Sequence, residues 1–196
     1  YARENLLSAD YYIVGNNDLL FESDFPRAIL KHRKTLDHYP VVSPNITTLE
    51  SVAQNPHVIK GISKFREFIY DIYHSNYTLA CLILYLSKKT HRFTDRTDEQ
   101  HHAVAQEIYQ GYGACYILGP KFFQLFSELW APTFLMYEEF FLAKQLNDKG
   151  FNIYYEPGIC VRHLCHGSVS LVPGKHIWRL SRDAHKEYRK YIKVWK

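Results

Sequence analysis

The sequence predicts an α/β domain, because short apolar segments of strand character alternate along the chain with segments of helical periodicity. A chain of 196 residues with 46% hydrophobic and 22% charged residues has the size and balance of one globular domain, which excludes the fibrous and wholly disordered classes. A domain of this length buries about 70% of the surface that its unfolded chain exposes, so it needs neither disulfides nor a metal to form a core.

The charge balance and the cysteines narrow the class of protein further. A net charge of +4 arises from 24 basic and 20 acidic residues spread along the chain, which is too mild for a nucleic-acid-binding module. An aromatic content of 16% favours a core with polar edges, or a surface that handles sugars, bases or lipid headgroups. The longest apolar run, 77–86, is about half of the ~20 residues that a membrane-spanning helix requires. We therefore expect a cytoplasmic protein in which Cys81, Cys115, Cys160 and Cys165 are reduced thiols.

The first half of the chain predicts two strands and several helices. The apolar residues 11–14 run into Gly15-Asn16-Asn17-Asp18, which predicts a strand that ends in a chain reversal. Ser23-Asp24-Phe25-Pro26 is typical of a helix start, and Pro44-Asn45 predicts the end of a strand. The remaining predictions, in order, are a basic amphipathic helix through 30–34, a strand at 40–46, a helix at 62–73, a helical or extended segment at 79–86 and a polar surface loop at 88–102.

The second half is more regular. A strand at 114–118 follows two glycines, and residues 120–125, beginning with Pro120, start a helix. Residues 133–150 have helical period, with Gly150 placed as a C-terminal stop. In that helix Glu139 shares one stripe with three apolar residues, Leu135, Leu142 and Leu146. Periodicity alone leaves two interpretations of Glu139: a half-exposed residue at the edge of the stripe, or a carboxylate aimed into a site.

Four motifs, taken in order, carry a family resemblance. They are Asn16-Asn17-Asp18 after an apolar strand, Gly111-Tyr-Gly-Ala-Cys115, Tyr137-Glu138-Glu139 at a helix start, and Phe151–Pro157 leading to His163. Together they resemble the C-terminal two-thirds of a family 2 glycosyltransferase of the rhamnosyltransferase-like kind, over residues from about Ala9 to Ser170. The resemblance implies a GT-A fold, a mostly parallel mixed sheet flanked by helices.

The resemblance assigns a cation and donor site to the first and last motifs. Asp18 would hold Mg²⁺ or Mn²⁺ on the diphosphate of a nucleotide sugar, with Asn16 and Asn17 as polar contacts, and His163 would approach the metal or the diphosphate. The segment from His166 to Ser170 resembles one that closes over the donor. An ordinary turn and a structural histidine are the plain alternatives. A zinc cluster of Cys160, His163, Cys165 and His166 is disfavoured, because zinc ligands usually come as two separated pairs.

The two middle motifs imply the catalytic and acceptor residues. Glu139 would remove the proton from the acceptor hydroxyl, while Glu138 would orient a substrate. Gly113 and Ala114 would let the backbone approach a ligand closely, although turn chemistry explains them equally well. Trp130 would stack on a sugar, with core packing as the alternative. The implied function is inverting sugar transfer from a nucleotide-diphosphate sugar to a hydroxyl of a glycan or lipid-linked acceptor, as in cell-surface polysaccharide synthesis.

The chain divides into a catalytic portion, 1–174, and a basic aromatic tail, 175–196. The tail is typical of a helix on an anionic membrane surface at the inner face of the membrane, and equally of a helix packed on the domain through Ile177, Leu180 and Ala184. The strands that hold the nucleotide base in this family do not precede Tyr1, so we expect a piece of a longer enzyme. The alternative is a non-catalytic glycan- or nucleotide-binding remnant of the fold.

Overall fold

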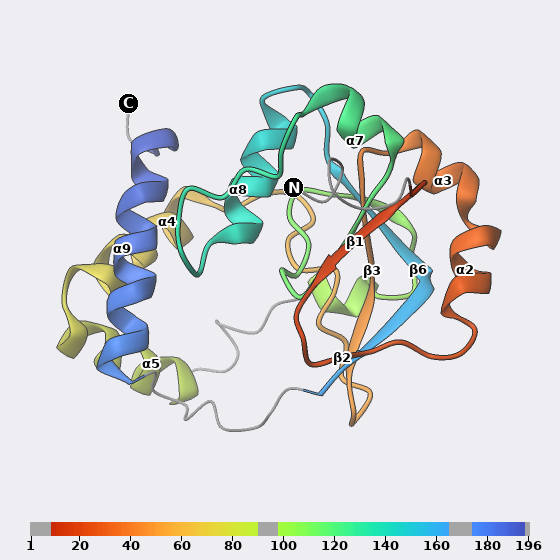
Figure 1. Cartoon of the computed structure of the whole chain (residues 1–196). Helices are drawn as coiled ribbons and strands as arrows, with labels where there is room; N and C mark the ends of the chain where they lie inside the picture. The colour runs from red at the N-terminus through yellow and green to blue at the C-terminus, as the bar shows by residue number, and fades with distance from the viewer. Residues whose placement is uncertain (1–8, 90–97, 165–173, 195–196) are drawn as a thin grey trace.

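The computed structural model describes residues 9–89, 98–164 and 174–194 (Figure 1). Its elements, in chain order, are β1 (Tyr12–Gly15), β2 (Leu19–Leu20), α2 (Phe25–Lys31), α3 (Arg33–His38), β3 (Val41–Thr48), α4 (Lys64–Ser75), α5 (Tyr77–Lys89), the 3-10 helix η1 (Asp98–His101), β4 (Gln106–Ile108), β5 (Cys115–Leu118), α7 (Pro120–Leu125), α8 (Glu138–Asn147), β6 (Ile153–His163) and α9 (Lys175–Tyr191). The α/β class predicted from the sequence is confirmed.

Local sequence signals account for several element boundaries. Helix α7 begins at Pro120, as predicted, with the proline in its first turn. Gly150 adopts the left-handed conformation, with φ of 77°, just after α8. The predicted basic helix is interrupted at His32 and forms α2 and α3. The segment 79–86 belongs to helix α5, and the predicted loop 88–102 contains η1, while residues 90–97 lie outside the described part.

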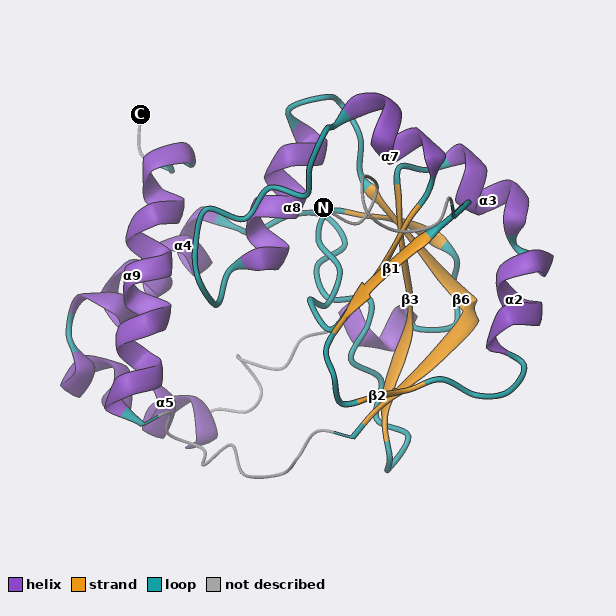
Figure 2. Cartoon of the chain, viewed as in Figure 1, coloured by secondary structure: helices purple, strands orange, loops and turns teal. Residues whose placement is uncertain are grey.

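The strands form one mixed sheet in the order β1-β5-β3-β6-β2, with β4 also paired to β6 (Figure 2). Among the described strands only β3 and β6 are parallel, and the other pairings are antiparallel. The prediction of a mostly parallel sheet is therefore wrong for this part of the chain. A strand sequence specifies which face is buried, but its direction relative to a neighbour depends on long-range pairing.

The structure of strand β3 contradicts a second prediction, that Pro44-Asn45 ends the strand. Its pairing with β6 continues through Pro44 and Asn45, where the register shifts from Glu156 to Cys160 on the partner strand. Proline cannot donate a hydrogen bond to a ladder, and it is tolerated in a sheet at such a bulge. Pro44-Asn45 therefore bends the strand rather than ending it.

Helices cover both faces of the sheet. Neighbouring residues on β3 belong to different cores, as expected for a strand whose side chains alternate between faces. Val42 packs with Phe25 and Leu36 of the α2–α3 pair, whereas Val41 packs with Phe122 of α7 and Leu142 of α8. The sheet therefore forms the middle layer of an α/β/α arrangement, and α8 is fixed to it directly.

The helices α4, α5 and α9 form a separate packed group beside the sheet (Figure 1). The tail residues predicted as a helix form α9, which is buried along Trp178, Ala184, His185 and Tyr188. Ala184 was predicted as a packing residue, whereas Ile177 is 40% exposed. None of the described helices is long and apolar enough to cross a membrane. Cys81, Cys115 and Cys160 are free thiols, as predicted, and Cys165 lies outside the described residues.

Buried polar groups join α9 to α4. The indole Nε1 of Trp178 donates to the carbonyl of Tyr73 at 3.1 Å, and the ring of His74 lies between the carbonyl of Tyr70 (2.8 Å) and the hydroxyl of Ser181 (3.1 Å). Burial lowers the pKa of His74 to about 4, and the stacked ring of His185 adds to this effect. His74 is therefore neutral in the folded protein at neutral pH.

His74 predicts a pH-dependent stability. Its folded pKa lies below the unfolded value of about 6.5, so the stability it contributes is complete above about pH 6.5 and is lost as the pH falls towards about 4. By this linkage, the free energy of unfolding should fall by about 2 kcal/mol more between about pH 7 and pH 5 in the wild type than in His74→Gln. Urea unfolding at both pH values measures this difference. Exposed His176 provides the control, since His176→Gln should keep the wild-type slope; an unchanged slope in His74→Gln would contradict the assignment.

Candidate functional site

A cavity of about 440 Å³ gathers residues from four segments that are far apart in the sequence. We call it the central cavity. It lies where the end of β1, the start of β5, the segment after α7 and the start of α8 meet, and its volume is in the range of ligand pockets. The predicted site residues that line it are Asn16, Gly113, Ala114, Trp130, Glu138 and Glu139. Asn17 is exposed and is not among the described lining residues.

A left-handed turn presents the two glutamates. Met136 and Tyr137 have φ values of 73° and 70°, which are uncommon for residues with side chains. The turn is held by a hydrogen bond from the Thr133 hydroxyl to the Met136 carbonyl, and by Glu138, whose Oε1 accepts from the Met136 N–H at 2.9 Å. Both glutamates thus occupy the first turn of α8, where the helix dipole favours carboxylates.

The predicted helix over 133–150 therefore begins later than expected. Leu135 precedes α8 and is 41% exposed, so it is not part of the buried stripe. Leu142 and Leu146 are buried as predicted, and Glu139 is half-buried. Two consecutive left-handed residues cannot belong to a right-handed helix, and periodicity does not detect them.

The glycine motif before β5 lies directly beside Glu139. A Cβ atom on Gly113 would come within 3.3 Å of the Glu139 Oε2, so a glycine there leaves room for the carboxylate. The hydroxyl of buried Tyr116 donates to the Gly111 carbonyl at 2.8 Å and holds this loop in place. Burial, followed by the negative charge of Glu139, raises the pKa of Tyr116 well above its ordinary value, so its hydroxyl keeps its proton.

Asp18 and His163, the two predicted metal ligands, lie together at the edge of the sheet. The Oδ1 of Asp18 is 3.1 Å from the Nε2 of His163, whose Nδ1 lies 3.0 Å from the Oε1 of Gln54. The backbone N–H of Leu164 donates to the Asp18 carbonyl at 2.9 Å, next to the pairing of β2 with β6. A turn and a strand end separated by 145 positions thus lie within hydrogen-bond distance of each other.

The zinc cluster is not formed by the described residues. Cys160 and His163 are three residues apart on β6, so their side chains point to opposite faces, one exposed and one buried. Within the described ranges there is no group of three or more histidine, cysteine or acidic side chains placed to hold a metal ion. Cys165 and the segment from His166 to Ser170 lie outside those ranges.

Trp130 packs in the core and also lines the central cavity. Its ring packs edge-on against Phe141 and Tyr191, with centroid distances of 5.2 and 4.8 Å. The same residue lines the central cavity, and its backbone N–H donates to the Oε1 of Gln145 at 3.1 Å. The indole is therefore held firmly by the core while it borders the site.

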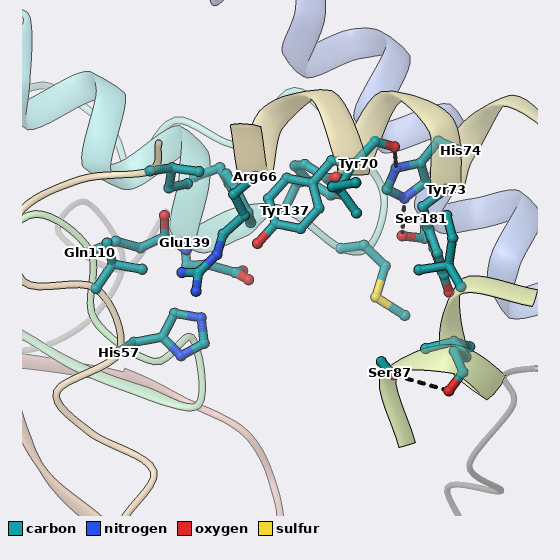
Figure 3. Close-up of a pocket in the computed structure, with 17 residues that line it drawn as sticks. His57, Arg66, Tyr70, Tyr73, His74, Ser87, Gln110, Tyr137, Glu139 and Ser181 are labelled. Carbon is teal, nitrogen blue, oxygen red and sulfur yellow. Dashed lines mark hydrogen bonds between the residues drawn. The ribbon is translucent and has the colours of Figure 1, made fainter. Parts of the chain in front are cut away.

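A second cavity of about 460 Å³ lies on the other side of Glu139. We call it the helical cavity, because α4, α5 and the start of α8 supply most of its wall (Figure 3). Figure 3 shows Arg66, His57, Gln110 and Glu139 gathered at one end of it. Glu139 lines both cavities, so its carboxylate stands between them.

The sequence by itself did not identify most of the residues that line the helical cavity. Arg66 lies within an amphipathic helix, and His57 follows Asn55 and Pro56 in an irregular loop that no motif marked. Tyr112 was inside a recognised motif, and its ring lies between those of His57 and His163, with centroid distances of 5.7 and 6.0 Å. The one sequence signal for Gln110 was its position directly before that motif.

The sequence matches no protein-family model and no curated protein.

The turn before Glu138 is tied to the tail helix. The hydroxyl of Tyr137 is 2.8 Å from the Nδ1 of His185, and the Nε2 of His185 is 2.8 Å from the Oδ1 of Asp71. Burial lowers the pKa of His185, so it is neutral; a proton on Nε2 lets it donate to Asp71 while Nδ1 accepts from Tyr137.

Tyr137→Phe removes one partner from this buried bond and leaves the His185 Nδ1 unsatisfied. The free energy of unfolding should fall by about 1–3 kcal/mol, the usual cost of an unpaired buried polar group. Urea unfolding measures it. Tyr191→Phe is the matched control, since Tyr191 is 43% exposed, and should unfold like the wild type. Equal stability of Tyr137→Phe and Tyr191→Phe would show that the bond contributes little.

Proposed function

We propose that this protein is an inverting glycosyltransferase that moves a sugar from a nucleotide-diphosphate sugar to a hydroxyl of a glycan or lipid-linked acceptor. The observation that carries the proposal is the convergence of the motif segments. Residues from three of them line the central cavity together with Trp130, and the fourth brings His163 to Asp18. Local turn chemistry explains each motif alone, but it does not explain why the motifs meet.

Glu139 is the proposed catalytic base. A sugar hydroxyl is a weak nucleophile, and a carboxylate within about 2.6–3.2 Å can take its proton as the new bond forms. Glu139 is half-buried, stands between two cavities and has a glycine beside it rather than a side chain. Glu138 is exposed and bonds to the turn backbone, which suits a positioning role.

Asp18 and His163 are the proposed cation ligands. They offer one carboxylate and one imidazole, and the buried His163 is oriented by Gln54. A hard divalent ion such as Mg²⁺ or Mn²⁺ commonly takes one or two protein ligands and completes its shell with phosphate oxygens and water, so this pair fits an ion that arrives with the diphosphate. When bound, the ion supplies positive charge that stabilises the departing diphosphate.

The proposed reaction is a single displacement. The acceptor oxygen forms a bond to the anomeric carbon as the bond from that carbon to the diphosphate oxygen breaks, which inverts the configuration. Glu139 takes the hydroxyl proton, and the nucleoside diphosphate leaves with the electron pair. Trp130 and the backbone at Gly113 border the space in which the sugar would lie.

The tail contributes a further part of the proposal. The buried side of α9 faces α4, while Lys175, Arg179 and Lys186 are exposed. A peripheral contact of this basic surface with an anionic membrane at the cytoplasmic side would bring the enzyme to a lipid-linked acceptor.

A non-catalytic glycan- or nucleotide-binding remnant is the second candidate. It is favoured by Asn16, which stands where an acidic residue is common, and by the two-residue cation site. The two experiments below separate it from the enzyme.

Glu139→Gln should lower sugar transfer by about 10²–10⁴-fold, because the amide keeps the shape of the side chain but cannot accept the proton. Glu138→Gln should act mainly on KM. The measurement is turnover with nucleotide sugars and hydroxyl acceptors, alongside thermal unfolding of both variants. A folded Glu139→Gln protein with normal turnover would end the base assignment, and a remnant would show no transfer even in the wild type.

Asp18→Asn should weaken Mn²⁺ binding in the presence of a nucleoside diphosphate by about tenfold or more, because an amide oxygen carries no charge for a hard ion. Electron paramagnetic resonance of Mn²⁺ with UDP, GDP or dTDP measures the free ion. Asp10→Asn, which removes an exposed carboxylate just before β1, is the control and should bind Mn²⁺ like the wild type. Equal Mn²⁺ binding by the wild type and Asp18→Asn would remove Asp18 from the site.

A further inference from the structure

The helical cavity has one polar end and one end whose polar groups are already bonded. At the second end, His74 is hydrogen-bonded to Tyr70 and Ser181, and the Ser87 hydroxyl donates to the Leu84 carbonyl at 2.9 Å (Figure 3). Ile62, Ile69 and Ile83 also line the cavity. This part therefore offers mainly apolar surface to anything that enters.

Gln110 places a side-chain amide at the polar end of the helical cavity. Its side chain is fully buried, and neither its Nε2 nor its Oε1 has a hydrogen-bond partner among the described residues. Its backbone is pinned by paired bonds to Val58, of 3.0 and 3.1 Å, so the residue has a fixed place in the wall. A buried amide without partners is costly, and such groups in folded proteins usually meet water or a ligand.

Arg66 places a guanidinium group at the same end of the helical cavity. In the part of the chain that the structure describes, the Arg66 guanidinium makes no hydrogen bond or ion pair, and the Arg66 backbone N–H donates to the Ser63 hydroxyl at 3.2 Å. The side chain is half-buried and lines the cavity beside Glu139 and His57 (Figure 3). A guanidinium in such a place is suited to bind a carboxylate or phosphate group in two-point contact.

We infer that the helical cavity binds an anionic amphiphile that carries a hydroxyl group, and that this molecule is the acceptor of the transfer. The anionic group lies on Arg66, hydroxyl groups or oxyanions bond to the amide of Gln110, and the apolar portion lies between α4 and α5. The reacting hydroxyl then meets Glu139 from the side opposite to the central cavity. The acceptor role rests on the proposed function, whereas the binding chemistry rests on the cavity alone.

The binding chemistry is tested without donor or divalent cation, by calorimetry with n-octyl phosphate below its micelle concentration. Inorganic phosphate supplies the anionic group alone, and n-octyl β-glucoside supplies the apolar chain and hydroxyls without charge. Octyl phosphate should bind at least about tenfold more tightly than either comparator. Arg66→Gln should lose about tenfold in affinity for octyl phosphate and none for octyl glucoside.

Two further variants test whether the loss of binding is specific to the residues of the cavity. Lys64→Gln removes a positive charge from the same turn of α4 at an exposed position, and should bind octyl phosphate like the wild type. Gln110→Met replaces the orphaned amide by an apolar side chain of similar shape, so it should unfold at the same temperature or higher and yet bind both amphiphiles more weakly. A purely structural Gln110 would leave binding unchanged.

The outcomes separate the inference from the proposed function. If octyl phosphate does not bind, or binds Arg66→Gln and the wild type equally, the inference is overturned, while Mn²⁺–diphosphate binding at Asp18 would still support the transferase. If octyl phosphate binds as expected and no nucleoside diphosphate binds, the cavity remains an amphiphile site and the acceptor role falls.

Discussion

A buried chain of polar contacts holds the left-handed turn at Met136 and Tyr137 against the helices α4 and α9. It runs from the Tyr137 hydroxyl through His185 to Asp71, which also pairs with Arg189 at 2.7 Å. Apolar contacts alone are non-directional and would allow α9 to slide on α4, whereas this chain has one arrangement in which every member is bonded. Burial alone would raise the pKa of Asp71, but the bonds from Arg189 and His185 lower it, so the carboxylate stays charged.

Helix α8 connects the sheet to the helices beside it. Helix α8 is fixed to the sheet through Leu142 and Leu146, and to α9 through Phe141 and the preceding Tyr137. Its first turn therefore sits at the junction of the two parts, and Glu139 faces a cavity on each side. This position suits the base role proposed for Glu139, because the proposed donor and acceptor could both reach it without displacing each other.

Much of the site follows from short sequence signals, and some of the fold does not. The turn at Asp18, the glycines before β5 and the glutamates at the start of α8 are local features, so motif order was enough to group them. Pro44-Asn45 does not end the strand, because the pairing of β3 with β6 continues past the proline and only the register shifts there. Periodicity predicts a helix from residue 133, whereas α8 begins at Glu138. The difference arises because periodicity does not detect the left-handed residues Met136 and Tyr137.

The sequence by itself determined the alternation of strands and helices, the faces they bury and the residue types that the site requires, because these depend on neighbours a few positions away. Only the tertiary structure decided the strand directions, the pairing of Asp18 with His163, and the wall formed by His57, Arg66 and Gln110. These features depend on contacts between segments that are tens of residues apart in the sequence. The packing of α4, α9 and the sheet around α8 selects those contacts, and local sequence patterns do not encode them.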